Sequence, residues 1–261
     1  MKETLAPLRT FLLDMDGTLY LGERLLPGAL EFLERLVATG RNRLFFTNNS
    51  SRDAGRYVEK LGKMGIQARP EEIITSGEAT IDYLKTIAGV ERVYPLGTES
   101  FEEEIRRGGL TVDDQSPQAV VLSFDLTLTY EKIRRGCDLI RKGAAFVATH
   151  PDLNCPSEEG PLPDCGAMAA MFTAATGVEP TVIGKPHRFM AEAALRRLGT
   201  TAAETAIVGD RLYTDMEMGF SAGLTTILVL SGETVREDLA GIGRQPTLVV
   251  DSVADLTPDL S

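Results

Sequence analysis

The chain has 261 residues, of which 43% are hydrophobic, and its formal net charge at pH 7 is −11. A chain of this length and composition can bury a large core, in one elaborate domain or two modest ones. The acidic charge argues against a nucleic-acid partner, because binding to a phosphate backbone needs a basic face. No apolar run approaches the roughly 20 residues that cross a bilayer, so no membrane partner is expected.

The cysteines and the first residues bear on the cellular compartment. Three cysteines, at 137, 155 and 165, are an odd number in a chain whose first seven residues lack the apolar stretch of a signal peptide. A disulfide framework is therefore not expected, and the thiols are predicted to be reduced. We expect a cytoplasmic location.

Apolar runs alternate with helical patterns along the chain, which predicts an α/β fold with a largely parallel sheet. Helices are predicted over residues 27–38 and 52–64, the first with a proline near its first turn and each closing before a glycine. Strands are predicted at residues 11–13, 44–46, 181–183, 206–208, 225–230 and 248–250.

The first of these strands is followed by two carboxylates, Asp14 and Asp16, on either side of Met15. Two acids at the end of a buried strand must bind something cationic or be held in different protonation states. That is the condition of a catalytic site. Taken alone, an Asp-x-Asp-Gly segment is also a common turn, so the prediction depends on the rest of the chain.

Polar residues follow three other predicted strands. Thr47 and Asn48 follow one, Lys185 follows another, and Asp210 follows a third, with Asp215 just beyond. Each alone has a plainer explanation as a helix cap, a surface lysine or a turn. Ligands of open α/β sheets bind at the carboxyl ends of the strands, so the four clusters are predicted to converge on one pocket.

The four clusters resemble the four motifs of the haloacid dehalogenase (HAD) superfamily in order and spacing. More narrowly, they are similar to the NagD-like, or 4-nitrophenylphosphatase-like, subfamily, which hydrolyses small phosphomonoesters. The segments that carry the resemblance are Asp14-Met15-Asp16-Gly17-Thr18, Leu26-Pro27-Gly28, Thr47-Asn48-Asn49-Ser50-Ser51-Arg52, Gly184-Lys185-Pro186 and Gly209-Asp210-Arg211-Leu212 with Asp215.

The resemblance implies a role for each of the first two acids. Asp14 is expected to be the nucleophile that forms an aspartyl-phosphate, and Asp16 the acid and base that protonates the leaving oxygen and then activates water. The implied cofactor is Mg²⁺, held by Asp14, Asp210 and the backbone carbonyl of Asp16. The side chain of Asp16 is expected to stay off the metal.

The other motif residues are expected to hold the phosphoryl group or support the metal. Thr47 would donate its hydroxyl, Asn48 its backbone amide, and Lys185 its charge. Asp215 is expected to support the metal site without coordinating directly. Tyr213 departs from the subfamily pattern, in which an aspartate is common at this position, and the missing carboxylate bears on metal affinity.

The segment between the second and third motifs has its own predicted strands, at residues 93–96, 120–123 and 146–149. We predict an inserted α/β cap domain at 78–179, in a Rossmann-like HAD core formed by 1–77 and 180–261; the resemblance implies a C2-type cap. The cap carries 17 acidic and 9 basic residues. This acidity suits a neutral or weakly charged leaving group, and its plainer explanation is a surface whose charges face only water. Relatives of this kind commonly form a homodimer through the cap.

The stretch around residues 150–155 and 161–165 is the predicted substrate-facing part of the cap, with His150, Asp152 and Asp164 as candidates for specificity. Zinc bound through His150, Asp164 and the two nearby cysteines is an alternative, but the spacing matches no familiar structural zinc pattern. His187 is expected to cap a helix or face solvent, because Asp16 already fills the acid-base role.

These features predict an Mg²⁺-dependent phosphatase acting on a small phosphorylated metabolite. A phosphomutase or phosphotransferase would use the same nucleophile, and a noncatalytic phosphometabolite-binding protein would be expected to lack Asp14. A dehalogenase has no leaving oxygen to protonate, so Asp16 and Asp210 together argue against it. Sugar phosphates, phosphoglycolate, glycerol phosphates, nucleoside monophosphates and pyridoxal phosphate all remain candidate substrates.

Overall fold

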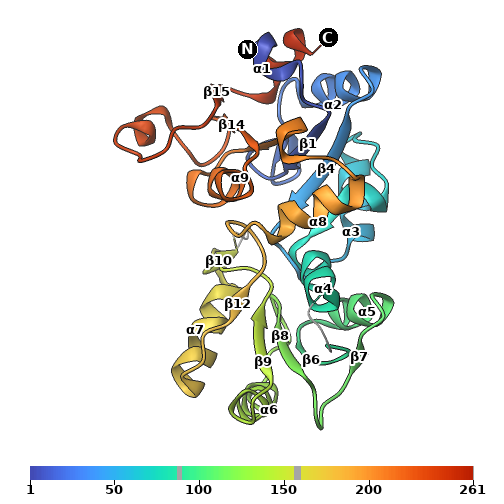
Figure 1. The fold of residues 1–261 in the computed structure, drawn as a ribbon, viewed down its shortest axis with the longest axis vertical. Helices are drawn as coiled ribbons and strands as arrows, with labels where there is room; N and C mark the ends of the chain where they lie inside the picture. The colour runs from blue at the N-terminus through green and yellow to red at the C-terminus, as the bar shows by residue number, and fades with distance from the viewer. Residues whose placement is uncertain (87–89, 156–159, 261) are drawn as a thin grey trace. The chain divides into compact units, whose positions relative to one another are not determined.

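The computed structural model describes residues 1–86, 90–155 and 160–260. The chain forms two compact units (Figure 1). The first unit comprises Met1–Thr47, Ala54–Ile74 and Pro186–Ser261, and the second comprises Asn48–Asp53 and Thr75–Lys185. In the described residues no helix has both the length and the apolar character needed to cross a membrane.

The first unit is built on a six-stranded sheet with the order β15-β14-β13-β1-β4-β5. The pairs β1–β13, β1–β4, β13–β14 and β14–β15 are all parallel. Strand β1 lies inside the sheet and is buried along its first four residues. The strands are β1 (Thr10–Asp14), β4 (Asn42–Thr47), β5 (Ile73–Thr75), β13 (Thr205–Gly209), β14 (Thr225–Val229) and β15 (Leu248–Val250), and a separate hairpin pairs β2 (Tyr20–Leu21) with β3 (Arg24–Leu25).

The helices of this unit bury one face against the sheet. Leu13 of β1, Phe45 of β4 and Phe32 of α2 are all within 1% of full burial and belong to one core cluster. Burying a side chain of this size contributes about 1.5–3 kcal/mol. The helices are α1 (Lys2–Leu5), α2 (Ala29–Ala38), α3 (Ala54–Lys63), α8 (Phe189–Leu198) and α9 (Glu217–Ala222), with short turns η1 (Pro70–Glu72), η2 (Ala202–Glu204), η3 (Leu212–Met216), η4 (Arg236–Leu239) and η5 (Val253–Asp259).

The second unit has a five-stranded sheet with the order β12-β9-β8-β6-β7, in which every neighbouring pair is parallel. Phe172 of α7 and Ile140 of α6 pack in one cluster with Val120 of β8. The elements are α4 (Ser76–Thr86), β6 (Arg92–Leu96), α5 (Glu99–Arg107), β7 (Thr111–Val112), β8 (Ala119–Leu122), α6 (Tyr130–Arg141), β9 (Ala145–Ala148), α7 (Cys165–Thr176) and β12 (Thr181–Val182), with a hairpin of β10 (Asn154–Cys155) and β11 (Leu162–Pro163).

The α/β fold class with parallel sheets is confirmed, and the predicted strands and the two predicted helices form within one or two residues of their expected bounds. One strand joins a different sheet. The strand predicted at 181–183 forms as β12, but Thr181 and Val182 pair with Val147 and Ala148 of β9. The lysine motif therefore follows the second sheet, whereas the other three motifs follow strands of the first. The domain bounds at 78 and 179 stay a prediction.

Glu104 of α5 makes the stability of the second unit depend on pH. Burial, followed by the nearby charges of Glu78 and Asp53, raises the pKa of Glu104 from 4.5 to about 8. The folded chain thus keeps a proton that the unfolded chain releases, so the free energy of unfolding falls as the pH rises through this window and stays lowered above it.

We expect Glu104→Gln to raise the melting temperature near pH 9 and to change it little near pH 4, with a gain on the order of 1 kcal/mol or more at the alkaline end. The amide keeps an acceptor for the Thr75 hydroxyl, which lies 3.4 Å from Oε1. Differential scanning calorimetry across this range is the measurement, with the exposed neighbour Glu103→Gln as control. An equal rise in melting temperature near pH 4 and near pH 9 would contradict the assignment of a bound proton to Glu104.

Candidate active site

Asp14 is the last residue of β1, and the turn that follows fixes the direction of the next residues. The amide of Gly17 donates to the Tyr20 carbonyl over 2.8 Å, and the amide of Leu19 donates to the Met15 carbonyl over 2.8 Å. The Thr18 hydroxyl lies 3.4 Å from Asp14 Oδ2. Asp16 is exposed within this turn, whereas Asp14 is half-buried. The two acids therefore have different surroundings, although only one residue separates them.

Gly17 has a positive φ of 89°, and a Cβ built on it would collide with the Asp210 carboxylate. Gly232 makes the same close approach from the opposite chain segment. Only glycine combines this backbone conformation with the space that Asp210 occupies. The carboxylate of Asp210, 2% exposed at the end of β13, is thereby held between two segments of backbone.

Residues 231–234, which follow β14 after one intervening residue, also hold Asp210 and form a cradle around it together with Gly17. The Glu233 amide donates to Asp210 Oδ2 over 2.7 Å, and the Thr234 amide donates to the Asp210 carbonyl over 3.2 Å. The Ser231 hydroxyl donates to the Gly17 carbonyl over 2.8 Å. Sequence reasoning missed this segment. Its only signal was position, since a Ser-Gly-Glu run follows a sheet strand at the carboxyl end, where ligands bind.

Asp215 is fully buried within η3, a single turn of π-helix before α9. Its Oδ2 accepts the Arg211 amide over 3.2 Å, and a Cβ on Gly209 would collide with its side chain. Asp14, Asp210 and Asp215 each offer a carboxylate oxygen, and these three oxygens lie within 4.8 Å of one another.

Three carboxylates this close repel one another unless a cation or protons offset their charge. Carboxylate oxygens are the ligands that Mg²⁺ prefers, so the donor set fits the expected metal. Asp215 stands inside this group by distance, although the sequence suggested only a supporting role, while the exposed Asp16 side chain is outside it. The expected coordination of Mg²⁺ by the backbone carbonyl of Asp16 stays a prediction.

Thr47 is the last residue of β4, which pairs beside β1 in the sheet, and its hydroxyl lies 3.5 Å from the Tyr57 hydroxyl. Asn48 and Lys185 fall in the second unit, where the structure brings them together. Asn48 Oδ1 accepts the Lys185 amide over 2.8 Å, and Asn48 Nδ2 donates to the Lys185 carbonyl over 3.0 Å. Both residues are buried.

The specificity candidates of the second unit lie close together but differ in exposure. His150 is fully buried, with Nε2 2.9 Å from Asp164 Oδ1 and Nδ1 3.0 Å from the Thr149 hydroxyl. Asp164 is 4% exposed and caps α7 through the Cys165 amide. Asp152 is half-buried and accepts Asn48 Nδ2 over 3.1 Å. His150, Asp152 and Asp164 also offer ligand atoms within 4.8 Å, a group that does not include the cysteines of the zinc alternative.

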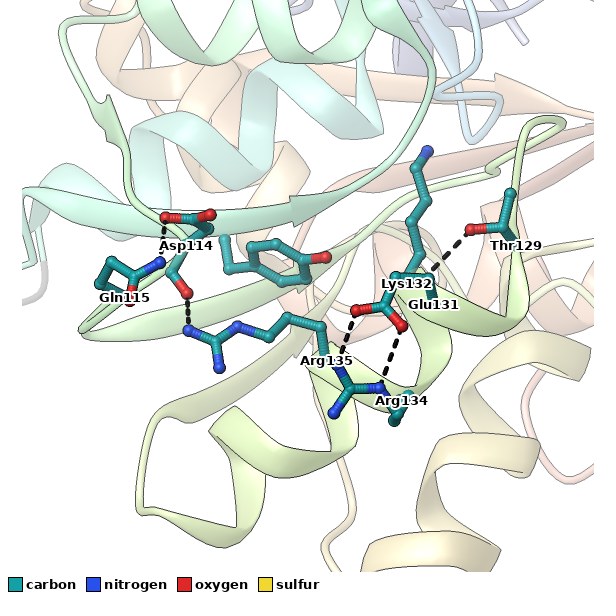
Figure 2. A pocket seen from close by; sticks show the side chains of 8 residues that line it. Asp114, Gln115, Thr129, Glu131, Lys132, Arg134 and Arg135 are labelled. Carbon is teal, nitrogen blue, oxygen red and sulfur yellow. Dashed lines mark hydrogen bonds and ion pairs between the residues drawn. The ribbon is translucent and has the colours of Figure 1, made fainter.

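A hollow of about 400 Å³ lies elsewhere in the second unit, around the start of α6 (Figure 2). Its cations are engaged by their neighbours: Arg134 pairs with Glu131 at 2.6 Å, Lys132 Nζ lies 2.8 Å from Asp125 Oδ2, and Arg135 donates to the Asp114 carbonyl. Because each of these cations already has a partner within the second unit, the hollow is a weaker candidate for a phosphate site than the carboxylate cluster.

Tyr213 supports the cradle of Asp210 from outside. Its hydroxyl donates to Glu233 Oε1 over 2.7 Å, and Glu233 Oε2 pairs with Arg211 at 2.9 Å. Tyr213 is 60% exposed, so its hydrogen bond to Glu233 is solvated and contributes little to stability.

We expect Tyr213→Phe to weaken Mg²⁺ binding by no more than a few-fold, as measured by isothermal titration calorimetry. Tyr130→Phe in the second unit should leave Mg²⁺ binding unchanged. A loss of a hundredfold or more would make the hydroxyl part of the metal site itself.

Family models match both ends of the chain. A model described as haloacid dehalogenase-like hydrolase matches residues 11–111, and one described as HAD-hydrolase-like matches residues 182–256. The chain is 38% identical over 248 residues to 5'-nucleotidase YutF of Bacillus subtilis (strain 168), with coverage of 95% of this chain and 97% of the relative. It is 37% identical to acid sugar phosphatase of Staphylococcus aureus (strain USA300), over 92% and 93% of the two chains.

Solved structures agree over nearly the whole length. The crystal structure of a 4-nitrophenylphosphatase from Thermotoga maritima superposes with a TM-score of 0.94 at 43% identity, over 99% of each chain. NagD from E. coli K-12 superposes with a TM-score of 0.90 at 31% identity, over 95% of this chain and 98% of that one. The chain belongs to the haloacid dehalogenase-like hydrolases and, within them, to the NagD-like phosphatases, which are phosphoric monoester hydrolases.

Proposed function

We propose that the chain hydrolyses small phosphomonoesters with Mg²⁺ and an aspartyl-phosphate intermediate on Asp14. The observation that carries the proposal is the separation of the two acids of the first motif. Asp14 shares a group of carboxylates with Asp210 and Asp215, whereas Asp16 is exposed and lies outside that group. These different surroundings support a role for Asp14 beside a cation and a role for Asp16 in proton exchange.

The two acids would act in sequence. Asp14 attacks phosphorus, so that a bond forms between its carboxylate oxygen and phosphorus while the bond to the ester oxygen breaks. Asp16 gives its proton to that leaving oxygen. In the second half, Asp16 takes a proton from water, the water oxygen bonds to phosphorus, and inorganic phosphate leaves with Asp14 restored as a carboxylate.

Asp14 and Asp210 would hold Mg²⁺, with the Asp16 carbonyl as a further ligand and Asp215 in support. The bound ion would offset the negative charge of the phosphoryl group and of the carboxylates. Thr47 would donate its hydroxyl, and Asn48 its amide, to phosphoryl oxygens, and Lys185 would supply a positive charge. Residues 78–179 would form the cap that meets the leaving group.

The substrate we propose is a sugar phosphate or a similar small metabolite. Support comes from relatives whose names include an acid sugar phosphatase and a 5'-nucleotidase. The 17 acidic against 9 basic residues of 78–179 favour a leaving group that is neutral or weakly charged. The cytoplasmic location and the homodimer remain predictions.

The proposal is tested by phosphate release from a panel of small phosphomonoesters with Mg²⁺ or with EDTA. We expect turnover with Mg²⁺, loss of turnover in EDTA, and recovery when Mg²⁺ is returned in excess, because the carboxylate cluster alone repels the phosphate dianion. Outside the panel, a nucleoside diphosphate is expected to be turned over more slowly than a sugar phosphate, because its leaving group is a charged nucleoside monophosphate. Turnover unchanged by EDTA would remove the metal from the proposal, and no turnover of any ester by folded protein with Mg²⁺ would remove hydrolysis.

A further inference from the structure

We infer that Asp152 is a positioning residue for Lys185, acting through the side-chain amide of Asn48. The inference rests on the proposed function, in which Lys185 binds the transferring phosphoryl group. It replaces substrate contact as the expected role of Asp152. The residues that carry it, Asn48, Asp152 and Lys185, all belong to the second unit.

The Asn48 side chain holds the peptide groups on both sides of the Lys185 α-carbon. Its Oδ1 accepts the Lys185 amide over 2.8 Å, and its Nδ2 donates to the Lys185 carbonyl over 3.0 Å. Asn48 is 7% exposed and Lys185 is 4% exposed, so water does not readily replace these bonds. The position of the lysine backbone is therefore set by one amide 137 residues away.

Asp152 reinforces the direction in which that amide faces. A carboxylate only accepts hydrogen bonds, so the –NH₂ end of Asn48, and not its oxygen, must point toward Asp152 Oδ2, which lies 3.1 Å from Nδ2. With Nδ2 there, Oδ1 faces the Lys185 amide. If the amide turned over, its oxygen would face the Lys185 carbonyl and its –NH₂ would face the Lys185 amide, and both bonds would be lost.

The two hydrogen bonds from the Asn48 side chain to the Lys185 backbone form a clamp, and the residues around this clamp leave it little freedom. A Cβ on Gly184 would lie 2.6 Å from the Thr149 carbonyl oxygen and 2.7 Å from Asn48 Oδ1, so the chain before Lys185 fits only as glycine. The Ser76 hydroxyl donates to the Asn48 carbonyl and lies 3.4 Å from Nδ1 of the buried His150. Asp164 holds the other side of that ring. His150 and Asp164 thus support the backbone of Asn48 while Asp152 orients its side chain.

A positioning role and a substrate-contact role make different predictions. If Asp152 touched the leaving group, its loss would change the ranking of substrates and would act mainly on KM. If it positions Lys185, its loss should lower kcat/KM by the same factor for every ester, because all share the phosphoryl group. The loss should also vanish when Lys185 is already absent, since the two residues act on one interaction.

The test measures kcat and KM for the ester panel in wild type, Asp152→Ala, Asp152→Asn, Lys185→Ala and the double variant Asp152→Ala with Lys185→Ala. We expect Asp152→Ala to lower kcat/KM roughly 10- to 100-fold for every ester, as loss of a bond to a charged group would. Asp152→Asn keeps a carbonyl oxygen for Asn48 Nδ2 and should restore activity to within about threefold. The double variant should be no slower than Lys185→Ala.

Asp113→Ala is the matched control, because Asp113 is also a half-buried carboxylate of the second unit and accepts the Gln115 and Ser116 amides. It should match wild type in the panel. Should Asp152→Ala fail to fold, Asp152→Leu gives the same test, since leucine is close to aspartate in size and offers Asn48 Nδ2 no acceptor. It should lower kcat/KM uniformly and add nothing to Lys185→Ala.

Two results would overturn the inference: a loss confined to some esters, or a double variant slower than Lys185→Ala by the full factor of Asp152→Ala. Failure of the proposed function appears separately, as wild type that releases phosphate from no ester. The inference is then judged by calorimetric binding of inorganic phosphate, which should weaken in Asp152→Ala, recover in Asp152→Asn and be indifferent to Asp152 once Lys185 is replaced.

Discussion

We expect Asp14→Asn to fold and to release phosphate at a rate lower than wild type by on the order of 10⁴-fold or more, whichever ester is supplied. The amide has the same size as the carboxylate but lacks the anionic lone pair that attacks phosphorus. It also takes one charge from the group that Asp14 forms with Asp210 and Asp215. Loss of a nucleophile removes the reaction path itself, so this effect should exceed that of every other single substitution at the site.

A stability measurement separates loss of the nucleophile from loss of the fold. Because like charges within 4.8 Å destabilise one another, Asp14→Asn should melt at the same temperature as wild type in EDTA, or higher. Asp113→Asn, in the second unit, serves as the matched control for kinetics. Release at more than a tenth of the wild-type rate by a well-folded Asp14→Asn protein would mean that another group attacks phosphorus.

Asp16→Asn should slow the two half-reactions unequally. With 4-nitrophenyl phosphate the leaving group departs without needing a proton, so the first half should remain fast. The second half needs a base to activate water, and its loss should cost about 10²- to 10⁴-fold. We therefore expect a burst of 4-nitrophenol equal to the enzyme concentration, followed by slow turnover, in stopped-flow absorbance.

An alkyl phosphate supplies the comparison. Its leaving oxygen needs the proton from Asp16, so the same variant should show slow release and no burst with that substrate. A burst with both esters would assign the proton to a different group, and no burst with either would mean that Asp16 acts before the phosphoenzyme forms. Because the Asp16 side chain is exposed, we expect Asp16→Asn to melt at the wild-type temperature, so any loss of rate reports on the chemistry.

The core of the site was predictable because its signals are local. Asp14 ends a strand whose apolar residues are all buried, and Asp210 directly follows β13, the neighbouring strand of the same sheet. Parallel pairing of β1 with β13 then brings their carboxyl ends together. Strand pattern and turn chemistry sufficed for that much.

What escaped prediction depends on long-range pairing. Nothing in the two residues Thr181 and Val182 indicates that they pair with β9 of the second sheet, since a short apolar strand fits either sheet equally well. The segment at 231–234 holds Asp210 mainly through backbone amides, which every sequence has. The Asn48 side chain meets a partner 137 residues away, so no local pattern could reveal its clamp on Lys185.

The most direct test of the central claim is to trap the intermediate. Wild-type protein is mixed with 4-nitrophenyl phosphate and Mg²⁺, quenched in acid within milliseconds, digested, and examined by mass spectrometry, with Asp16→Asn in parallel to slow the second half. We predict a phosphate adduct on the peptide that contains Asp14, more abundant in Asp16→Asn and absent in Asp14→Asn. An adduct on a different residue, or full turnover by Asp16→Asn with no adduct at any time point, would contradict the aspartyl-phosphate mechanism.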